Sequence, residues 1–108
     1  MSTTISDQDL ALKLADAADE ISLSRFRALD LKVESKPDSS HVTDADRSVE
    51  ARLRAILERH RPEDSIIGEE FENSGSSERT WIIDPIDGTA NYLRGIPIWA
   101  SLIALRVG

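Results

Sequence analysis

The chain has 108 residues, 13 of them Lys or Arg and 20 of them Asp or Glu, so its formal net charge at pH 7 is −7. Hydrophobic residues make up 40% and charged residues 31%, a balance typical of one globular domain. An acidic surface repels phosphate backbones and anionic lipids, which argues against nucleic-acid or membrane binding, and the lack of cysteine excludes disulfides and thiol chemistry.

The two ends of the chain carry different signals. The first residues, Met1 to Asp7, have neither the cationic flank nor the apolar core of a signal peptide. The apolar stretch from Ile96 to Leu105 is too short to span a bilayer, so we expect a cytoplasmic protein. The last residues, Trp99 to Gly108, indicate a buried strand that runs to the terminus, and we expect residues 1–108 to be the first part of a longer domain.

Apolar residues at helical spacing predict two helices in the first 60 residues. The first covers residues 7–28 and has Ser6 as its N-cap. Its inward face consists of Leu10, Leu14, Ala17 or Ala18, and Ile21. The second covers residues 44–59, with Thr43 as N-cap and Asp46 three positions later, an arrangement typical of a capping box. Its inward face consists of Val49, Leu53, Ile56 and Leu57.

The other segments predict short strands and loops. In chain order they are a strand at 31–34, a turn-rich loop at 36–40, an apolar run at 65–67, a loop at 72–79, a buried strand at 81–83, a compact turn at 84–89, a short helix at 90–94 and a strand from about residue 98. This order predicts an α+β fold in which two helices pack on a mostly antiparallel sheet.

The segment from Asp84 to Thr89 (Asp-Pro-Ile-Asp-Gly-Thr) carries the strongest functional signal. It places the carboxylates of Asp84 and Asp87 three residues apart at the exit of a strand, where the carbonyl of Ile86 can point at the same place. These are hard oxygen ligands, which suit Mg²⁺ rather than zinc or copper. The segment therefore indicates a magnesium site.

The backbone N–H groups of Gly88, Thr89 and Ala90 follow at the start of the expected short helix. Helix starts attract phosphate, and carboxylates that would repel a phosphate attract it when a metal lies between them. A purely local alternative stays open, because Asp, Pro and Gly are common in turns that bind nothing.

Two further acidic clusters add to this picture. Glu69 and Glu70 follow the apolar run at 65–67, and one of them completes the carboxylate set if that run neighbours the strand before Asp84. Otherwise they belong to a solvated loop. Asp46 is either a capping residue or a site residue, and its place in the helix does not decide between the two. His41, in a polar loop, lacks ligand spacing and is interpreted as structural.

Three segments together resemble the inositol monophosphatase family of Mg²⁺-dependent phosphatases. They are Val-Thr-Asp-Ala-Asp at 42–46 with Val49-Glu50, Ile-Gly-Glu-Glu at 67–70, and Trp-Ile-Ile-Asp-Pro-Ile-Asp-Gly-Thr-Ala-Asn at 81–91. Their order and spacing match across about residues 10–107. Within the family, the segments that look most like the actinobacterial type of histidinol-phosphate phosphatase are 25–31, 36–38, 43–47 and 98–105.

The resemblance implies a role for each matching residue. Two or three Mg²⁺ ions are implied, and their ligands would be Glu69, Asp84, Asp87 and the carbonyl of Ile86. The phosphate would be held by the N–H groups of Gly88, Thr89 and Ala90. Catalytic roles would fall to Asp46 and Thr89, which would hydrogen-bond and orient the attacking water, and to Glu70 as a supporting carboxylate. Lys36 would lie on a mobile loop near the phosphate.

The resemblance also implies what the whole protein does. Residues 1–108 would be the N-terminal half of a layered αβαβα fold, forming a homodimer, with the substrate pocket and a further metal-binding Asp in the C-terminal half. The implied reaction is hydrolysis of a small phosphorylated substrate, L-histidinol phosphate, with inositol monophosphate or another sugar phosphate as the alternative. Two other classes stay open: a non-catalytic metal-binding regulatory module, and a structural fragment whose acidic turn only caps a helix.

Overall fold

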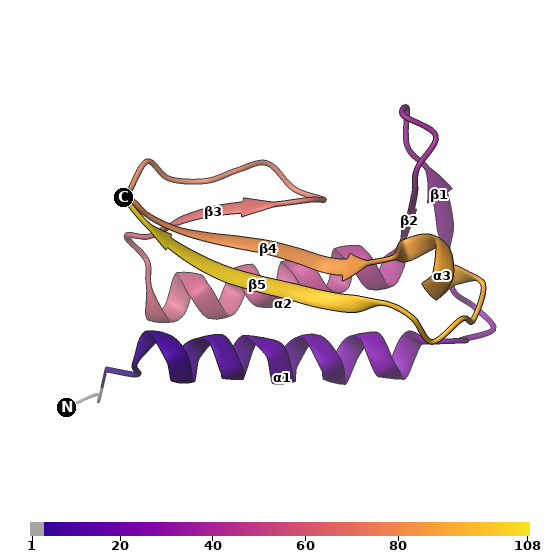
Figure 1. The fold of residues 1–108 in the computed structure, drawn as a ribbon, viewed down its shortest axis with the longest axis horizontal. Coiled ribbons are helices and arrows are strands. Elements are labelled where there is room, and N and C mark those ends of the chain that lie inside the picture. The colour runs from indigo at the N-terminus through magenta and orange to yellow at the C-terminus, as the bar shows by residue number, and fades with distance from the viewer. Residues whose placement is uncertain (1–3) are drawn as a thin grey trace.

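A computed structural model describes residues 4–108 as two long helices beside a small sheet, with a hairpin at one end (Figure 1). The elements in chain order are α1 (Asp7–Arg25), β1 (Val33–Ser35), β2 (His41–Thr43), α2 (Asp44–His60), β3 (Ser65–Gly68), β4 (Arg79–Asp87), α3 (Thr89–Leu93) and β5 (Ala100–Val107). None of the helices in residues 4–108 has the length and apolar character needed to cross a membrane.

The two long helices begin where the sequence predicts. The Ser6 hydroxyl accepts a hydrogen bond from the Asp9 backbone N–H at 3.1 Å, which caps α1. At α2, the Thr43 and Asp46 side chains bond each other's backbone N–H groups in a complete capping box. The first helix ends at Arg25 rather than at residue 28, because Phe26 is extended and Arg27 has a positive φ of 61°.

The three-stranded sheet has the order β3–β4–β5. β4 lies between a parallel neighbour, β3, and an antiparallel neighbour, β5, and the β1–β2 hairpin forms a separate antiparallel pair. Among residues 4–108 two of the three strand pairings are therefore antiparallel. This confirms the predicted α+β class, with two helices on a mostly antiparallel set of strands.

The hairpin corrects the prediction for residues 31–41. The strand expected at 31–34 is displaced to β1 (Val33–Ser35), and its partner β2 (His41–Thr43) was not predicted at all. His41 consequently lies in a strand and not in a loop. Three-residue strands rich in polar side chains carry almost no periodic signal, which explains the error.

β4 corrects the compact turn predicted at 84–89. The strand continues through Asp87, and its register against β5 shifts between Asp84, opposite Leu102, and Asp87, opposite Ala100. An extra residue on β4 therefore bulges there, and Pro85 is tolerated because a bulge leaves a backbone N–H unpaired in any case. Asp84 and Asp87 thus lie on either side of a bulge within the strand and not in a loop.

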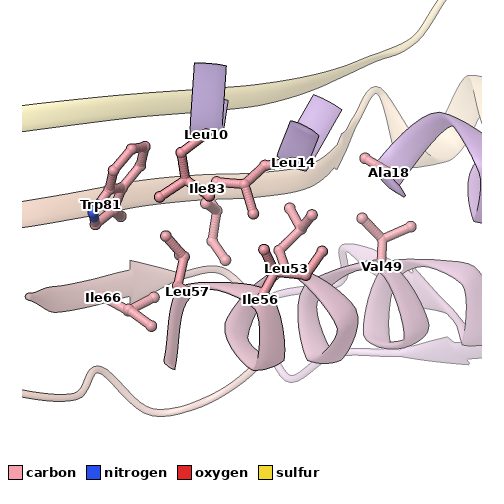
Figure 2. Packing of buried hydrophobic residues seen from close by; sticks show 10 residues of the cluster. All are labelled: Leu10, Leu14, Ala18, Val49, Leu53, Ile56, Leu57, Ile66, Trp81 and Ile83. Carbon is pink, nitrogen blue, oxygen red and sulfur yellow. The ribbon is translucent and has the colours of Figure 1, made fainter. Parts of the chain in front are cut away.

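Both helices pack on the same face of the sheet. Figure 2 shows side chains from α1, α2, β3 and β4 meeting in one apolar cluster. Its members are Leu10, Leu14, Ala18, Val49, Leu53, Ile56, Leu57, Ile66, Trp81 and Ile83. The predicted inward faces are confirmed, with Ala18 fully buried and Ile21 partly buried at the edge of the cluster.

The opposite face of the sheet is open at β5. Residues along this strand alternate between half-buried, facing the helices, and exposed, and the side chain of Leu102 is 49% exposed. The prediction of a buried strand at the end of the chain is therefore wrong for residues 4–108, because no described element covers the second face. An apolar face of this kind is typical of a surface that receives another layer.

We expect Leu14→Ala to destabilise the fold by about 2–5 kcal/mol, because it removes a fully buried side chain and leaves a cavity between the helices and the sheet. Leu12 is a matched control on the same helix, since its side chain is 58% exposed and its truncation should cost less than about 1 kcal/mol. Urea unfolding of both variants measures the difference. Equal losses would show that α1 does not pack as described.

Candidate functional site

Parallel pairing of β3 and β4 brings the acidic segments together. Gly68 at the end of β3 pairs with Ile83 of β4, so the residues that follow, Glu69 and Asp84, lie at the same edge of the sheet. Asp84 itself stays within β4, opposite Leu102 of β5, while Glu69 lies one residue beyond β3. The two acidic segments are therefore neighbours, as the predicted carboxylate set requires. Carboxyl ends of adjacent parallel strands are a common place for ligand sites.

An open cavity of about 480 Å³ lies at this end of the strands and is lined in part by the β1–β2 hairpin. Nine residues predicted for the site line it: Lys36, Glu69, Glu70, Asp84, Ile86, Asp87, Gly88, Thr89 and Ala90. Sequence reasoning missed Ser39, Ser40 and His41, which also line it, because it did not foresee that residues 33–43 form a hairpin beside the acidic segments. The tenth predicted residue, Asp46, is buried and reaches the site through Thr89.

The negative charges at this edge act on one another. Burial, followed by the charges of Glu69 and Asp87, raises the pKa of Asp84 from 3.8 to about 6. Mutual repulsion of this kind is relieved by a cation, so the electrostatics of the cavity favour a bound positive charge.

The donor set suits a hard divalent cation, although the side chains are not closed around one. In residues 4–108, no group of three or more His, Cys, Asp or Glu side chains stands in a geometry that would hold a metal ion. Glu69 and Asp87 are exposed at the cavity, and Glu70 is bonded to Lys36. Carboxylate oxygens beside the Ile86 carbonyl are ligands that Mg²⁺ accepts. Ligation would require the carboxylates to draw together, and the metal roles stay a prediction.

We expect Asp84→Asn to stabilise the fold at neutral pH in a chelator. The folded-state pKa of Asp84 lies above 3.8, so its ionised form opposes folding above about pH 6 and ceases to do so once pH falls below 3.8. The full shift corresponds to about 3 kcal/mol, and because Asp84 is only partly buried we expect about 1 kcal/mol.

The measurement is urea unfolding of Asp84→Asn across this pH range. The free energy of unfolding of this variant should exceed that of the wild type at neutral pH, and the difference should shrink as pH falls. Asp16→Asn, a change at an exposed position of α1, should show no such trend. An advantage that grows toward low pH would contradict the raised pKa of Asp84.

Asp46 caps α2 and also contacts Thr89, so its capping role is present and its role in a site stays a prediction. Its Oδ2 accepts hydrogen bonds of 2.7 Å from the backbone N–H and from the hydroxyl of Thr43, which completes the cap of α2. Its Oδ1 accepts a bond of 3.0 Å from the Thr89 hydroxyl. The predicted Asp46–Thr89 contact is thus present, and capping fixes the carboxylate that holds the Thr89 hydroxyl.

The Thr89 hydroxyl lies between two acceptors. It is 3.0 Å from Asp46 Oδ1 and 3.0 Å from the carbonyl oxygen of Ile86. Because a hydroxyl has one proton, it can donate to only one of them at a time and retains acceptor capacity for a third group. Gly88, just before it, has a φ of 91°, and a Cβ there would lie 3.1 Å from the Ile98 carbonyl oxygen, so this turn requires glycine.

Lys36 joins the hairpin to the acidic edge. Its Nζ lies 2.8 Å from Glu70 Oε1, and the Glu70 side chain is only 6% exposed. Burial raises the pKa of Glu70, while the bond to Glu70 raises the pKa of Lys36. Lys36 also lines the same cavity as residues 88–90, the segment predicted to bind phosphate, so its predicted position is consistent with the structure.

Comparison with known proteins agrees with this geometry. The profile of the inositol monophosphatase family matches residues 6–108. The chain belongs to the inositol monophosphatase family. Its αβ arrangement is also found in a solved structure: the suhB extragenic suppressor protein of Bartonella henselae superposes with a TM-score of 0.87 at 32% identity, covering 93% of this chain and 40% of that one.

Two histidinol-phosphatases are more similar in sequence to this chain. The histidinol-phosphatase of Streptomyces coelicolor is 56% identical over 101 residues, which are 94% of this chain and 38% of that protein. The histidinol-phosphatase of Mycobacterium tuberculosis is 58% identical over 100 residues, which are 92% of this chain and 38% of that protein. The chain therefore spans less than half the length of these relatives.

Proposed function

We propose that residues 1–108 are the N-terminal, metal- and phosphate-binding part of a Mg²⁺-dependent phosphomonoesterase that hydrolyses L-histidinol phosphate to L-histidinol and phosphate. The observation that carries the reaction class is the convergence of the two acidic strand ends with the Asp46–Thr89 pair in one cavity. The substrate rests on the high identity to two histidinol-phosphatases. Inositol monophosphate is the alternative substrate.

Bound Mg²⁺ would neutralise phosphate charge and make water a nucleophile at neutral pH, and Glu69, Asp84, Asp87 and the Ile86 carbonyl would hold it. The chain's own groups do the rest. Thr89 receives a proton or a hydrogen bond from the attacking water and passes its own proton toward Asp46 Oδ1 at 3.0 Å. The N–H groups of the segment 88–90 orient the phosphate oxygens as their charge shifts during the reaction.

The remainder of the domain is part of the proposal. The exposed face of β5, with Leu102 at its centre, is where a further layer would complete the fold. That layer would supply the residues that recognise the alcohol group and a further metal-binding carboxylate, so residues 1–108 alone are expected to be inactive. The cytoplasmic location and the homodimer stay predictions, and sedimentation of the complete protein measures the second.

The experiment is a phosphate-release assay on the complete protein with Mg²⁺, comparing L-histidinol phosphate with inositol 1-phosphate. We expect a higher kcat/KM for histidinol phosphate, because the chain is most similar in sequence to histidinol-phosphatases among the relatives described above. The ratio of the two kcat/KM values measures the difference in transition-state binding. A preference for the inositol ester would contradict the proposed substrate but would leave the proposed reaction class unchanged. Mg²⁺ binding with no release from either ester would instead favour the non-catalytic regulatory module.

A further inference from the structure

Glu50 is a fully buried carboxylate that the proposed mechanism does not use. It lies on α2 among the apolar residues, with 0% of its surface exposed. Its Oε1 accepts a hydrogen bond from the backbone N–H of Glu70 at 2.9 Å, and its Oε2 accepts one from the backbone N–H of Phe71 at 2.9 Å. A buried charge persists only where it is paired and hydrogen-bonded. The two N–H groups supply these hydrogen bonds, so the Glu50 carboxylate holds the backbone at Glu70 and Phe71.

Arg54 completes the contact one helical turn later. Its Nε donates to Glu50 Oε2 at 3.0 Å, and its Nη2 donates to the carbonyl oxygen of Phe71 at 3.3 Å. The guanidinium also lies 5.9 Å from the centroid of the Phe71 ring. α2 therefore holds the backbone of Phe71 by both its N–H and its C=O.

Gly68 shows how closely the Glu50 carboxylate approaches the end of β3. A Cβ added to Gly68 would lie 2.5 Å from Glu50 Oε2 and 2.7 Å from Oε1. The φ of Gly68 is not in the left-handed region, so the space taken by the carboxylate, and not the backbone conformation, is what requires glycine here.

These contacts fix the backbone on both sides of Glu69. On one side, Gly68 is paired with Ile83 of β4, and on the other, Glu70 is bonded to Glu50. We propose that Glu50 is a positioning residue, whose buried carboxylate anchors the segment 69–71 to α2 so that the Glu69 and Glu70 side chains face the cavity. This inference rests on the proposed function, since it assigns Glu50 the task of aligning carboxylates for a divalent cation.

The test is Glu50→Gln in the complete protein, measured by calorimetric titration with Mg²⁺ alone and by amide hydrogen exchange at Glu70 and Phe71. Gln has a single acceptor oxygen, so one N–H loses its partner, and Arg54 loses its counter-charge. We expect Mg²⁺ binding weakened by about tenfold or more and faster exchange of the two amides. Glu58→Gln, the same change at an exposed position of α2, is the matched control and should alter neither.

Gly68→Ala gives an independent variant if Glu50→Gln does not fold. It leaves the charge unchanged and displaces the same carboxylate from the β3 side, so it should also weaken Mg²⁺ binding, and more Mg²⁺ should restore activity. If the role of Glu50 is only structural, both substitutions will lower the unfolding temperature and leave the Mg²⁺ affinity of the folded protein unchanged. That result would overturn the inference. If the variants bind Mg²⁺ more weakly but the wild type has no phosphatase activity, the inference is supported and the proposed function is contradicted.

Discussion

Replacement of Asp84 or Asp87 by Asn should reduce phosphate release by the complete protein about a thousandfold or more, equivalent to about 4 kcal/mol of transition-state stabilisation. Asn keeps the shape of each side chain but removes the negative charge that attracts Mg²⁺ beside Glu69. Both positions flank the bulge of β4, so their backbone is fixed by pairing with β5 on either side and should survive the change.

The measurements for these two variants are kcat/KM at saturating Mg²⁺ and the Mg²⁺ dissociation constant. Asp16→Asn, on the exposed face of α1, is the control and should match the wild type in both. Variants with changed stability but wild-type Mg²⁺ affinity and activity would mean that the acidic segment is only a structural bend. The function proposed for the whole protein would then fall with the metal site.

The local features of this fold follow from local sequence. The caps at Ser6 and Thr43 and the inward faces of both helices are confirmed, because a hydroxyl at an N-cap and an apolar stripe at helical spacing act within a few residues of themselves. By contrast, the sequence predicts that Glu69 and Asp84 converge only if the run at 65–67 pairs with the strand before Asp84. It depends on which strand pairs with β4, and this choice is made by packing between distant segments.

Two features near the site, Glu50 and the β1–β2 hairpin, were not predicted from the sequence. Glu50 lies beside the apolar stripe of α2, and the family resemblance implies no role for it. A charged residue at a position that helical spacing directs inward is itself a signal, because burial of an unpaired carboxylate is costly. The hairpin that lines the cavity gave no signal in the sequence, because its strands are three residues each and depend on their mutual pairing and on the neighbouring α3 for their position.

Thr89→Val should lower kcat by about a hundredfold while changing KM little, because it removes a group that acts on the proton of the attacking water and not on substrate binding. Val matches Thr in shape, so the space between Asp46 Oδ1 and the Ile86 carbonyl stays filled, while the hydroxyl that lies 3.0 Å from each of them is lost. The Thr43 bonds to Asp46 Oδ2 are untouched, so the cap of α2 should persist.

Thr89→Ser is the rescuing control for this experiment. It restores the hydroxyl without the methyl group and should return kcat to within about tenfold of the wild type. If Val and Ser lower kcat equally, the methyl packing of Thr89 matters and its hydroxyl does not. If Val raises KM and leaves kcat alone, the hydroxyl contributes to holding the phosphate, and Asp46 is then a capping residue whose second oxygen only orders Thr89.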